Sequence, residues 1–114
     1  MKKDRIPKLL KTQIATYIHQ NLPVSNIGAL VTITDIKVSA NLSLAKIHLS
    51  FMPINHAKNQ KYFLNQIENQ KAEIKKHLAR TLGYTLRTIP ELLFYIDDTA
   101  QKAVEMERIL SKIN

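Results

Sequence analysis

Residues 86–98 read LRTIPELLFYIDD, and this stretch places the junction between a helix and a strand. Pro90 disfavours a helical conformation at the preceding Ile89 and cannot donate a hydrogen bond within a sheet. A helix must therefore stop before the proline, and a strand can begin only after it. The apolar run that follows alternates with a period of two until a pair of aspartates ends it. We predict a basic helix that extends to Arg87 and a buried strand over residues 91–96.

The helix before this junction is predicted from apolar residues at a spacing of four. Ile74, Leu78 and Leu82 share one face. Lys76 and Arg80 project from the opposite side. We therefore expect this helix to carry a cationic outer face as far as the junction.

A first amphipathic helix of about four turns is predicted near the N-terminus from the same spacing. Its apolar face consists of Ile6, Leu9, Leu10, Ile14, Tyr17 and Ile18. Asp4 can cap this helix, and Pro7 is tolerated in the first turn because an amide there has no intrahelical partner. At about 100° per residue, Arg5 and Lys8 lie opposite the apolar face and Lys11 lies on its flank. One side of the helix is thus predicted to pack while the other stays cationic.

Two strands are predicted between these helices. Residues 29–38 alternate apolar and polar side chains, with a slip in phase at Asp35 that indicates a β-bulge. Residues 39–41 supply a turn, and residues 42–52 resume the alternation. The two segments together predict an antiparallel hairpin with one face on the core.

The remaining segments are a connector and two more helices. Residues 21–28 are punctuated by proline, asparagine and glycine, which is typical of a connector. A helix with Phe63, Ile67 and also Tyr62 turned inward follows the hairpin, and a short helix is predicted over about residues 99–114. The order α-β-β-α-α-β, plus this short terminal helix, is that of a type II KH domain. We expect an α+β fold whose three-stranded sheet is covered by helices on one face.

The length and the charge of the chain restrict what it can be. It has 114 residues with 45% hydrophobic content and no internal linker, so we expect residues 1–114 to form a single domain. The formal charge is +8 and the pI is about 9.8, which favours a polyanionic partner. Residues 1–11 and 71–87 each hold five basic residues and one acidic residue, whereas residues 88–114 hold three and five. The alternative is that the surplus lysine only keeps the protein soluble.

Several functional classes lack support in the sequence. Cysteine is absent, which excludes disulfides and thiolate metal sites and agrees with a cytoplasmic location. No apolar stretch resembles a signal peptide or a membrane span. Asp97 and Asp98 alternate across a strand end rather than converge on a metal, and no metal or cofactor is expected. No ligand spacing or acid/base pairing is found among His19, His48, His56 and His77. A small nuclease is therefore disfavoured, whereas a generic RNA or DNA binder stays open.

Specific motifs accompany this element order. Besides the basic amphipathic start, they are VTITDIKVS at residues 31–39, NLSLAKIHLS at residues 41–50 and LRTIPELLFYIDD at residues 86–98. The last two follow the patterns D-L-S-x-A-K-V and L-R-x-x-P-E-L-x-F-x-x-D-D in order and spacing. On these motifs the chain resembles the ribosome-binding factor A family along nearly its whole length.

The resemblance implies a bacterial cytoplasmic protein without catalytic activity. Such a protein binds the free small (30S) ribosomal subunit and assists late maturation of its 16S rRNA. Charge placement and resemblance together predict that the protein contacts RNA through two basic helical faces. Nothing in the sequence demands more than a monomer, and a monomer is expected. The predicted RNA-binding residues are Arg5, Lys8, Lys11, Lys75, Lys76, Arg80 and Arg87.

The chain departs from related patterns in several places. It lacks the GXXG loop with which many KH domains clamp a nucleic-acid backbone. The family replaces that loop with a kink at Ala-x-Gly, and the matching positions here are Gln70-Lys71-Ala72. Asn41 stands where many members have aspartate, and residues 79–85 form a segment about two residues longer than in many members. Because aromatic residues are few and mostly assigned to the core, we expect little stacking on single-stranded bases.

Overall fold

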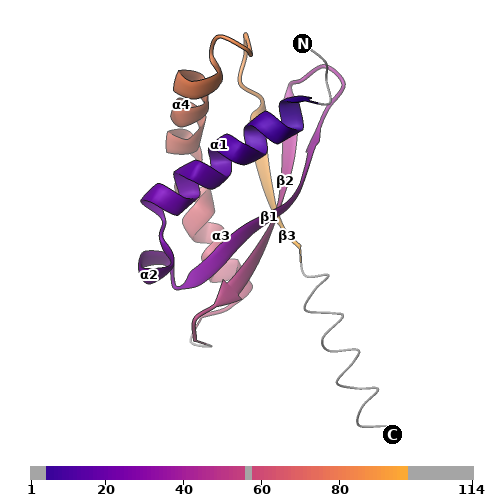
Figure 1. The fold of residues 1–114 in the computed structure, drawn as a ribbon. Helices are drawn as coiled ribbons and strands as arrows, with labels where there is room; N and C mark the ends of the chain where they lie inside the picture. Colours follow the sequence, from indigo (N-terminus) through magenta and orange to yellow (C-terminus); the bar gives the residue numbers. More distant parts are fainter. Residues whose placement is uncertain (1–4, 56–57, 98–114) are drawn as a thin grey trace, which may run out of the picture.

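A three-stranded sheet with helices on one face makes up the described part of the chain (Figure 1). The structure is a computed structural model that describes residues 5–55 and 58–97. The predicted cap at Asp4 and the predicted C-terminal helix lie outside these residues. The elements in chain order are α1 (Arg5–Asn21), α2 (Val24–Ile27), β1 (Ala29–Val38), β2 (Leu44–Pro53), α3 (Gln60–Glu68), α4 (Lys71–Leu82) and β3 (Glu91–Ile96).

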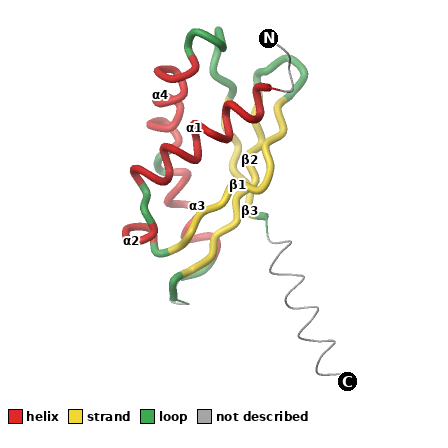
Figure 2. Tube along the Cα trace, viewed as in Figure 1, coloured by secondary structure: helices red, strands yellow, loops and turns green. Residues whose placement is uncertain are grey.

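The sheet has the strand order β1-β2-β3. Figure 2 shows its strands in yellow and the helices in red. β1 and β2 pair antiparallel, which confirms the predicted hairpin, and β3 adds parallel to β2 after the crossover through α3 and α4. The register shifts between Ile33 and Asp35, so Thr34 is the extra residue of the predicted bulge. The Thr34 hydroxyl donates to the carbonyl oxygen of His48 at 3.2 Å. Because of the bulge, Ile33 and Ile36 are both buried although three positions separate them.

The two faces of the sheet differ in composition. On the covered face, alternate residues of the strands are buried or partly buried beneath the helices, and the buried ones include Ala45, Ile47, Leu49, Leu92 and Phe94. The intervening positions face the other way and are exposed or half-buried. The structure therefore confirms the predicted α+β fold with helices on one face. No helix among the described residues is long and apolar enough to cross a membrane.

The predicted apolar face of α1 is confirmed. Its buried residues are Ile6, Leu10, Ile14, Tyr17 and Ile18, and Leu9 is partly buried against them. Pro7 lies in the first turn, as predicted. This face packs on β1 and α4, which leaves the outer side of α1 to solvent.

Two local predictions need correction. The connector after α1 contains the short helix α2, which ends at Gly28, whose φ of 88° is a left-handed conformation that favours glycine. Tyr62 does not turn inward: 37% of its surface is exposed, and Lys58 Nζ lies 4.9 Å from its ring centroid. Phe63 and Ile67 fill the helical face that packs on the core, and Tyr62 lies on its flank.

The end of α4 also differs from the prediction. The helix stops at Leu82, and residues 83–90 form a connection to β3, so Arg87 lies outside the helix. The amides of Thr85 and Leu86 both donate to the carbonyl oxygen of Leu82, at 2.9 and 2.8 Å, which closes a turn. Pro90 restricts only the residue before it, and therefore sets the latest point at which a helix can end rather than the actual one.

Candidate nucleic-acid interface

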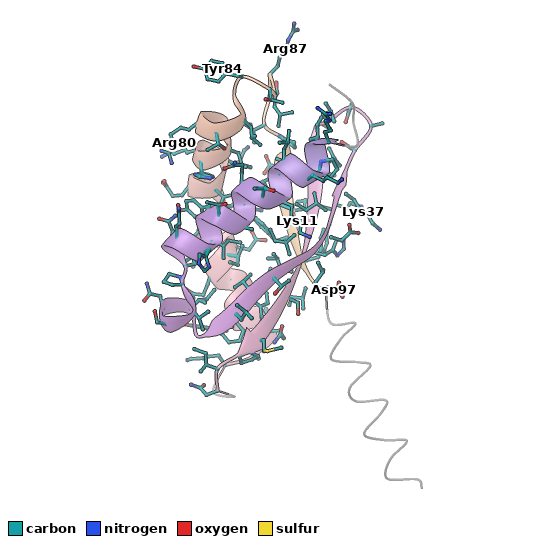
Figure 3. All side chains as sticks on the ribbon, in the orientation of Figure 1. Lys11, Lys37, Arg80, Tyr84, Arg87 and Asp97 are labelled. Carbon is teal, nitrogen blue, oxygen red and sulfur yellow. The ribbon has the colours of Figure 1, made fainter. Side chains whose placement is uncertain are left out.

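The cations of α1 are exposed because the opposite side of the helix is buried. Arg5, Lys8 and Lys11 are all exposed, and none forms an ion pair within the described residues. Figure 3 shows Lys11 on the side of α1 that faces the strands in this view. The predicted exposure of these three residues is confirmed, and their contact with RNA stays a prediction.

The cations of α4 fall into two groups. Lys75 is half-buried with its Nζ 3.1 Å from Glu91 Oε2, and Lys76 Nζ lies 3.4 Å from Glu73 Oε1. The Lys76–Glu73 pair is largely exposed and the Lys75–Glu91 pair is partly exposed. Ion pairs at the surface contribute about 0–1 kcal/mol, so a phosphate can replace either carboxylate at little cost. Arg80 is exposed and forms no ion pair in the part of the chain that the structure describes.

Arg87 lies beyond the end of α4, in the connection to β3. Leu86 is buried, and burying a leucine contributes about 1.5–3 kcal/mol, so the connection is held against the core next to Arg87. Figure 3 shows Arg87 and Tyr84 at the same end of the molecule, with Arg80 on the nearby last turn of α4. Arg80 thus lies on the last turn of α4, Arg87 lies in the connection that follows it, and Lys11 lies on α1.

The helices that carry these cations pack on each other through polar contacts. His77 Nε2 lies 3.2 Å from Gln13 Oε1, and the rings of His77 and Tyr17 are 5.5 Å apart between centroids. The Tyr17 hydroxyl donates to Gln70 Oε1 at 2.8 Å. Burial, reinforced by Glu73 and opposed by Arg80, raises the pKa of Tyr17 above its ordinary value. These contacts add to the apolar packing between α1 and α4.

The break between α3 and α4 lies at Asn69 and Gln70, and Gln70 is the first of the three positions that correspond to Ala-x-Gly. Gln70 adopts φ −100° and ψ 3°, which interrupts the helix without glycine. Its side chain accepts the hydrogen bond from Tyr17, so α1 holds the break in place. The kink therefore exists in this chain with a polar anchor instead of a small residue.

Exposed aromatic rings are the feature that sequence reasoning missed. Tyr84 is fully exposed in the connection after α4, and 40% of the Tyr95 surface is exposed on β3. The alternation of β3 could have placed Tyr95 on the outer face, since it falls between the buried Phe94 and the partly buried Ile96. Nothing in the periodicity of α4 could have placed Tyr84. The expectation that aromatics belong mostly to the core is right for Tyr17 and the phenylalanines, but not for Tyr84, Tyr95 and the Tyr62 already described.

The histidines and carboxylates do not assemble into a metal centre among the described residues. His48 stacks on Tyr95, His77 contacts Gln13 and His19 is exposed. His56 and Asp98 lie outside the described residues.

A surface hollow of about 390 Å³ lies between the end of α1, α2 and β1. Its lining includes Ile18, Leu22 and Val31 and contains no lysine, arginine or carboxylate. Thr16, His19 and Gln20 are the polar residues of the lining, and none of the predicted RNA-binding residues belongs to it. The hollow is therefore separate from the basic surfaces described above.

The sequence model of the family described as ribosome-binding factor A matches residues 2–110. This chain belongs to the ribosome-binding factor A family. Ribosome-binding factor A from Macrococcus caseolyticus is 30% identical over 114 residues, which cover 100% of this chain and 96% of that protein. A relative with the same description from Chlorobium phaeobacteroides (strain DSM 266) is 29% identical over 110 residues, which cover 96% of this chain and 91% of that protein.

Solved structures of ribosome-binding factor A share the fold. The crystal structure of the Thermus thermophilus protein has a TM-score of 0.67 at 18% identity and covers 83% of this chain and 94% of its own. A homology model of the Thermus thermophilus protein has been fitted into the cryo-EM map of a 30S–RbfA complex. It has a TM-score of 0.61 at 17% identity and covers 80% of this chain and 90% of its own. The likeness confirms the arrangement of strands and helices for the described residues.

Proposed function

We propose that this protein is a cytoplasmic assembly factor that binds the free small (30S) ribosomal subunit and assists late maturation of its 16S rRNA. Membership of the ribosome-binding factor A family across residues 2–110 is the observation that carries this proposal. A member of the family has been fitted into the map of a 30S complex, which supports the choice of partner. The protein acts as a monomer, through binding and not through catalysis.

The charges on the two helical surfaces support RNA as the binding target. Five of the seven predicted residues, Arg5, Lys8, Lys11, Arg80 and Arg87, are exposed without an ion pair in the described residues. Cations of this kind bind phosphates with little dependence on sequence, while the rigid shape of the domain selects the site. Arginine also binds phosphate in a bidentate geometry, which favours Arg80 and Arg87 as anchors.

Sedimentation tests the partner directly. The protein is centrifuged with separated small subunits, large subunits and joined ribosomes, and we expect it to sediment with free small subunits alone. Bulk RNA in excess serves as competitor and should displace it poorly, because shape complementarity adds to the phosphate contacts. Equal binding to all particles, or complete displacement by bulk RNA, would establish a generic RNA binder instead.

Charge reversal in the same assay tests the surface. The variant Arg80→Glu with Arg87→Glu should lower the affinity for small subunits at least about tenfold, because two phosphate contacts become repulsive. The matched control Lys58→Glu with Lys61→Glu changes the net charge equally at exposed positions outside the predicted set. An equal loss in both variants would show that only the total charge matters.

A further inference from the structure

The open face of the sheet carries a second basic and aromatic surface, on the side away from the helices. The register places Lys37 of β1 directly opposite Lys46 of β2, with Leu93 of β3 beside Lys46. Both lysines are exposed, and their neighbours along each strand point into the core or toward it. This face is separate from the cations of α1 and α4 that carry the proposed function.

The two lysines form an unfavourable pair that an anion would relieve. Like charges directly opposite each other on adjacent strands destabilise a sheet. Neither Lys37 nor Lys46 forms an ion pair within residues 5–55 and 58–97. A phosphate placed between the two ammonium groups would remove their mutual repulsion and satisfy both.

An aromatic platform lies on the neighbouring row of the same face. There the register aligns Asp35, His48 and Tyr95 across the three strands. The rings of His48 and Tyr95 stack with their centroids 5.4 Å apart and their planes inclined by 24°. Tyr95 belongs to an edge strand and 40% of its surface is exposed, so a third planar ring can extend the stack. Nucleobases stack on such rings whatever their sequence.

The spacing of the two rows fits one nucleic-acid strand. Rows on one face are two residues apart, about 6.6 Å along the strands, so a phosphate on the lysines and a base on the rings belong to neighbouring nucleotides. The carboxylate of Asp35 disfavours a phosphate on the aromatic row and so keeps it on the lysine row. A duplex cannot use this site because its bases are paired and stacked inside it.

We propose that the open face of the sheet binds an unpaired RNA strand, with a base stacked on Tyr95 and His48 and a phosphate held between Lys37 and Lys46. The site is independent of the helical surfaces. The protein therefore contacts RNA on two opposite sides, with one side suited to folded RNA and the other to a single strand.

Fluorescence anisotropy with the full chain tests this site. The probe is a labelled ten-nucleotide RNA of adenosine and cytidine without self-complementarity. Tyr95→Ala should weaken binding about tenfold or more, and Tyr95→Phe should bind like the natural protein, because the ring and not the hydroxyl stacks. Binding of a blunt RNA duplex should not change in either variant. Unchanged single-strand affinity in Tyr95→Ala would overturn the proposal.

The lysines are tested against a matched pair. Lys37→Ala with Lys46→Ala should bind the single strand more weakly than Lys58→Ala with Lys61→Ala, although both variants lose two charges. Equal losses would refute a specific phosphate site.

Polyglutamate serves as a second probe in the same assay. If it binds with the same affinity as the RNA, and if Tyr95→Ala leaves that affinity unchanged, the face is a surface for acidic protein instead. Circular dichroism melting checks that each variant is folded. These probes contain no ribosomal subunit, so a negative result leaves the proposed function standing.

Discussion

Gly83 shows how one residue shapes the end of α4. Its φ of −60° and ψ of −25° are accessible to any residue, so conformational freedom is not the reason for glycine here. A Cβ atom at this position would lie 2.5 Å from the carbonyl oxygen of Ala79, far inside van der Waals contact. The absent side chain permits the close turn that carries Tyr84 and Arg87 away from the helix.

The variant Gly83→Ala should therefore be less stable than the natural protein. Alanine in place of a glycine with helical dihedrals ordinarily stabilises by about 0.4–1 kcal/mol. Here the collision with backbone reverses the sign, and we expect a loss of about 1–2 kcal/mol in the free energy of unfolding, measured in urea. Thr85→Ala, at an exposed neighbouring position, is the control and should change stability by less than about 0.5 kcal/mol. A more stable Gly83→Ala would contradict the close contact.

At the joint between α1 and the start of α4, the phenol of Tyr17 takes part in two of the contacts between the helices. Tyr17 donates to Gln70 at the break between α3 and α4, and its ring contacts His77 on α4. Burial raises the pKa of Tyr17, which means that folding favours the neutral hydroxyl. Its contribution to stability is complete below the unfolded pKa of about 10 and is lost as pH rises through the higher folded pKa.

The contacts at this joint predict that the difference in stability between the natural protein and the Tyr17→Phe variant depends on pH. At pH 7, Tyr17→Phe should be about 0.5–1.5 kcal/mol less stable, because the hydrogen bond to Gln70 is lost. Above about pH 10 the difference should shrink, since only the natural protein has a phenol whose ionisation folding opposes. Urea unfolding of both proteins between about pH 7 and pH 11 measures it, and the phenylalanine variant controls for lysine titration. A difference that stays constant with pH would count against the joint.

The spacing of apolar residues predicted the helices and strands whose buried face repeats along the chain. It failed where the structure depends on contacts between residues far apart in the sequence. The apolar spacing of α1 and the alternation of β2 each specify a buried face, so both elements were predicted correctly. The end of α4 depends on the Gly83 turn and on the burial of Leu86, which no period encodes. The exposed stack of His48 on Tyr95 arises from the pairing of β2 with β3, residues far apart in the chain.

At the scale of the whole molecule, the cations lie on separate surfaces. Arg80 projects from the last turn of α4, Arg87 lies in the connection to β3, and Lys11 lies along α1 on the side toward the strands (Figure 3). These cations fit a folded RNA that curves around the protein, which agrees with a ribosomal partner.

Salt should therefore weaken binding to small subunits strongly. If the five unpaired cations on α1 and at the end of α4 contact phosphates, affinity should fall about a hundredfold between ~50 and ~200 mM salt. The affinity is measured across this range, and the slope of its logarithm against the logarithm of the salt concentration gives the number of phosphates contacted. Arg80→Glu with Arg87→Glu should lower that slope, while the control at Lys58 and Lys61 keeps it. An affinity that barely responds to salt would show that phosphates are not the main attachment.

The bulge at Thr34 has a consequence for self-association. β1 is an edge strand of ten residues, and the outer side of an edge strand presents unpaired N–H and C=O groups to any extended chain. The extra residue interrupts this row near its middle and increases the local twist. A second copy of the protein thus meets two short, misaligned runs instead of one long template. Thr34, the bulge residue that returns Ile36 to the core, therefore also opposes the growth of a sheet between molecules.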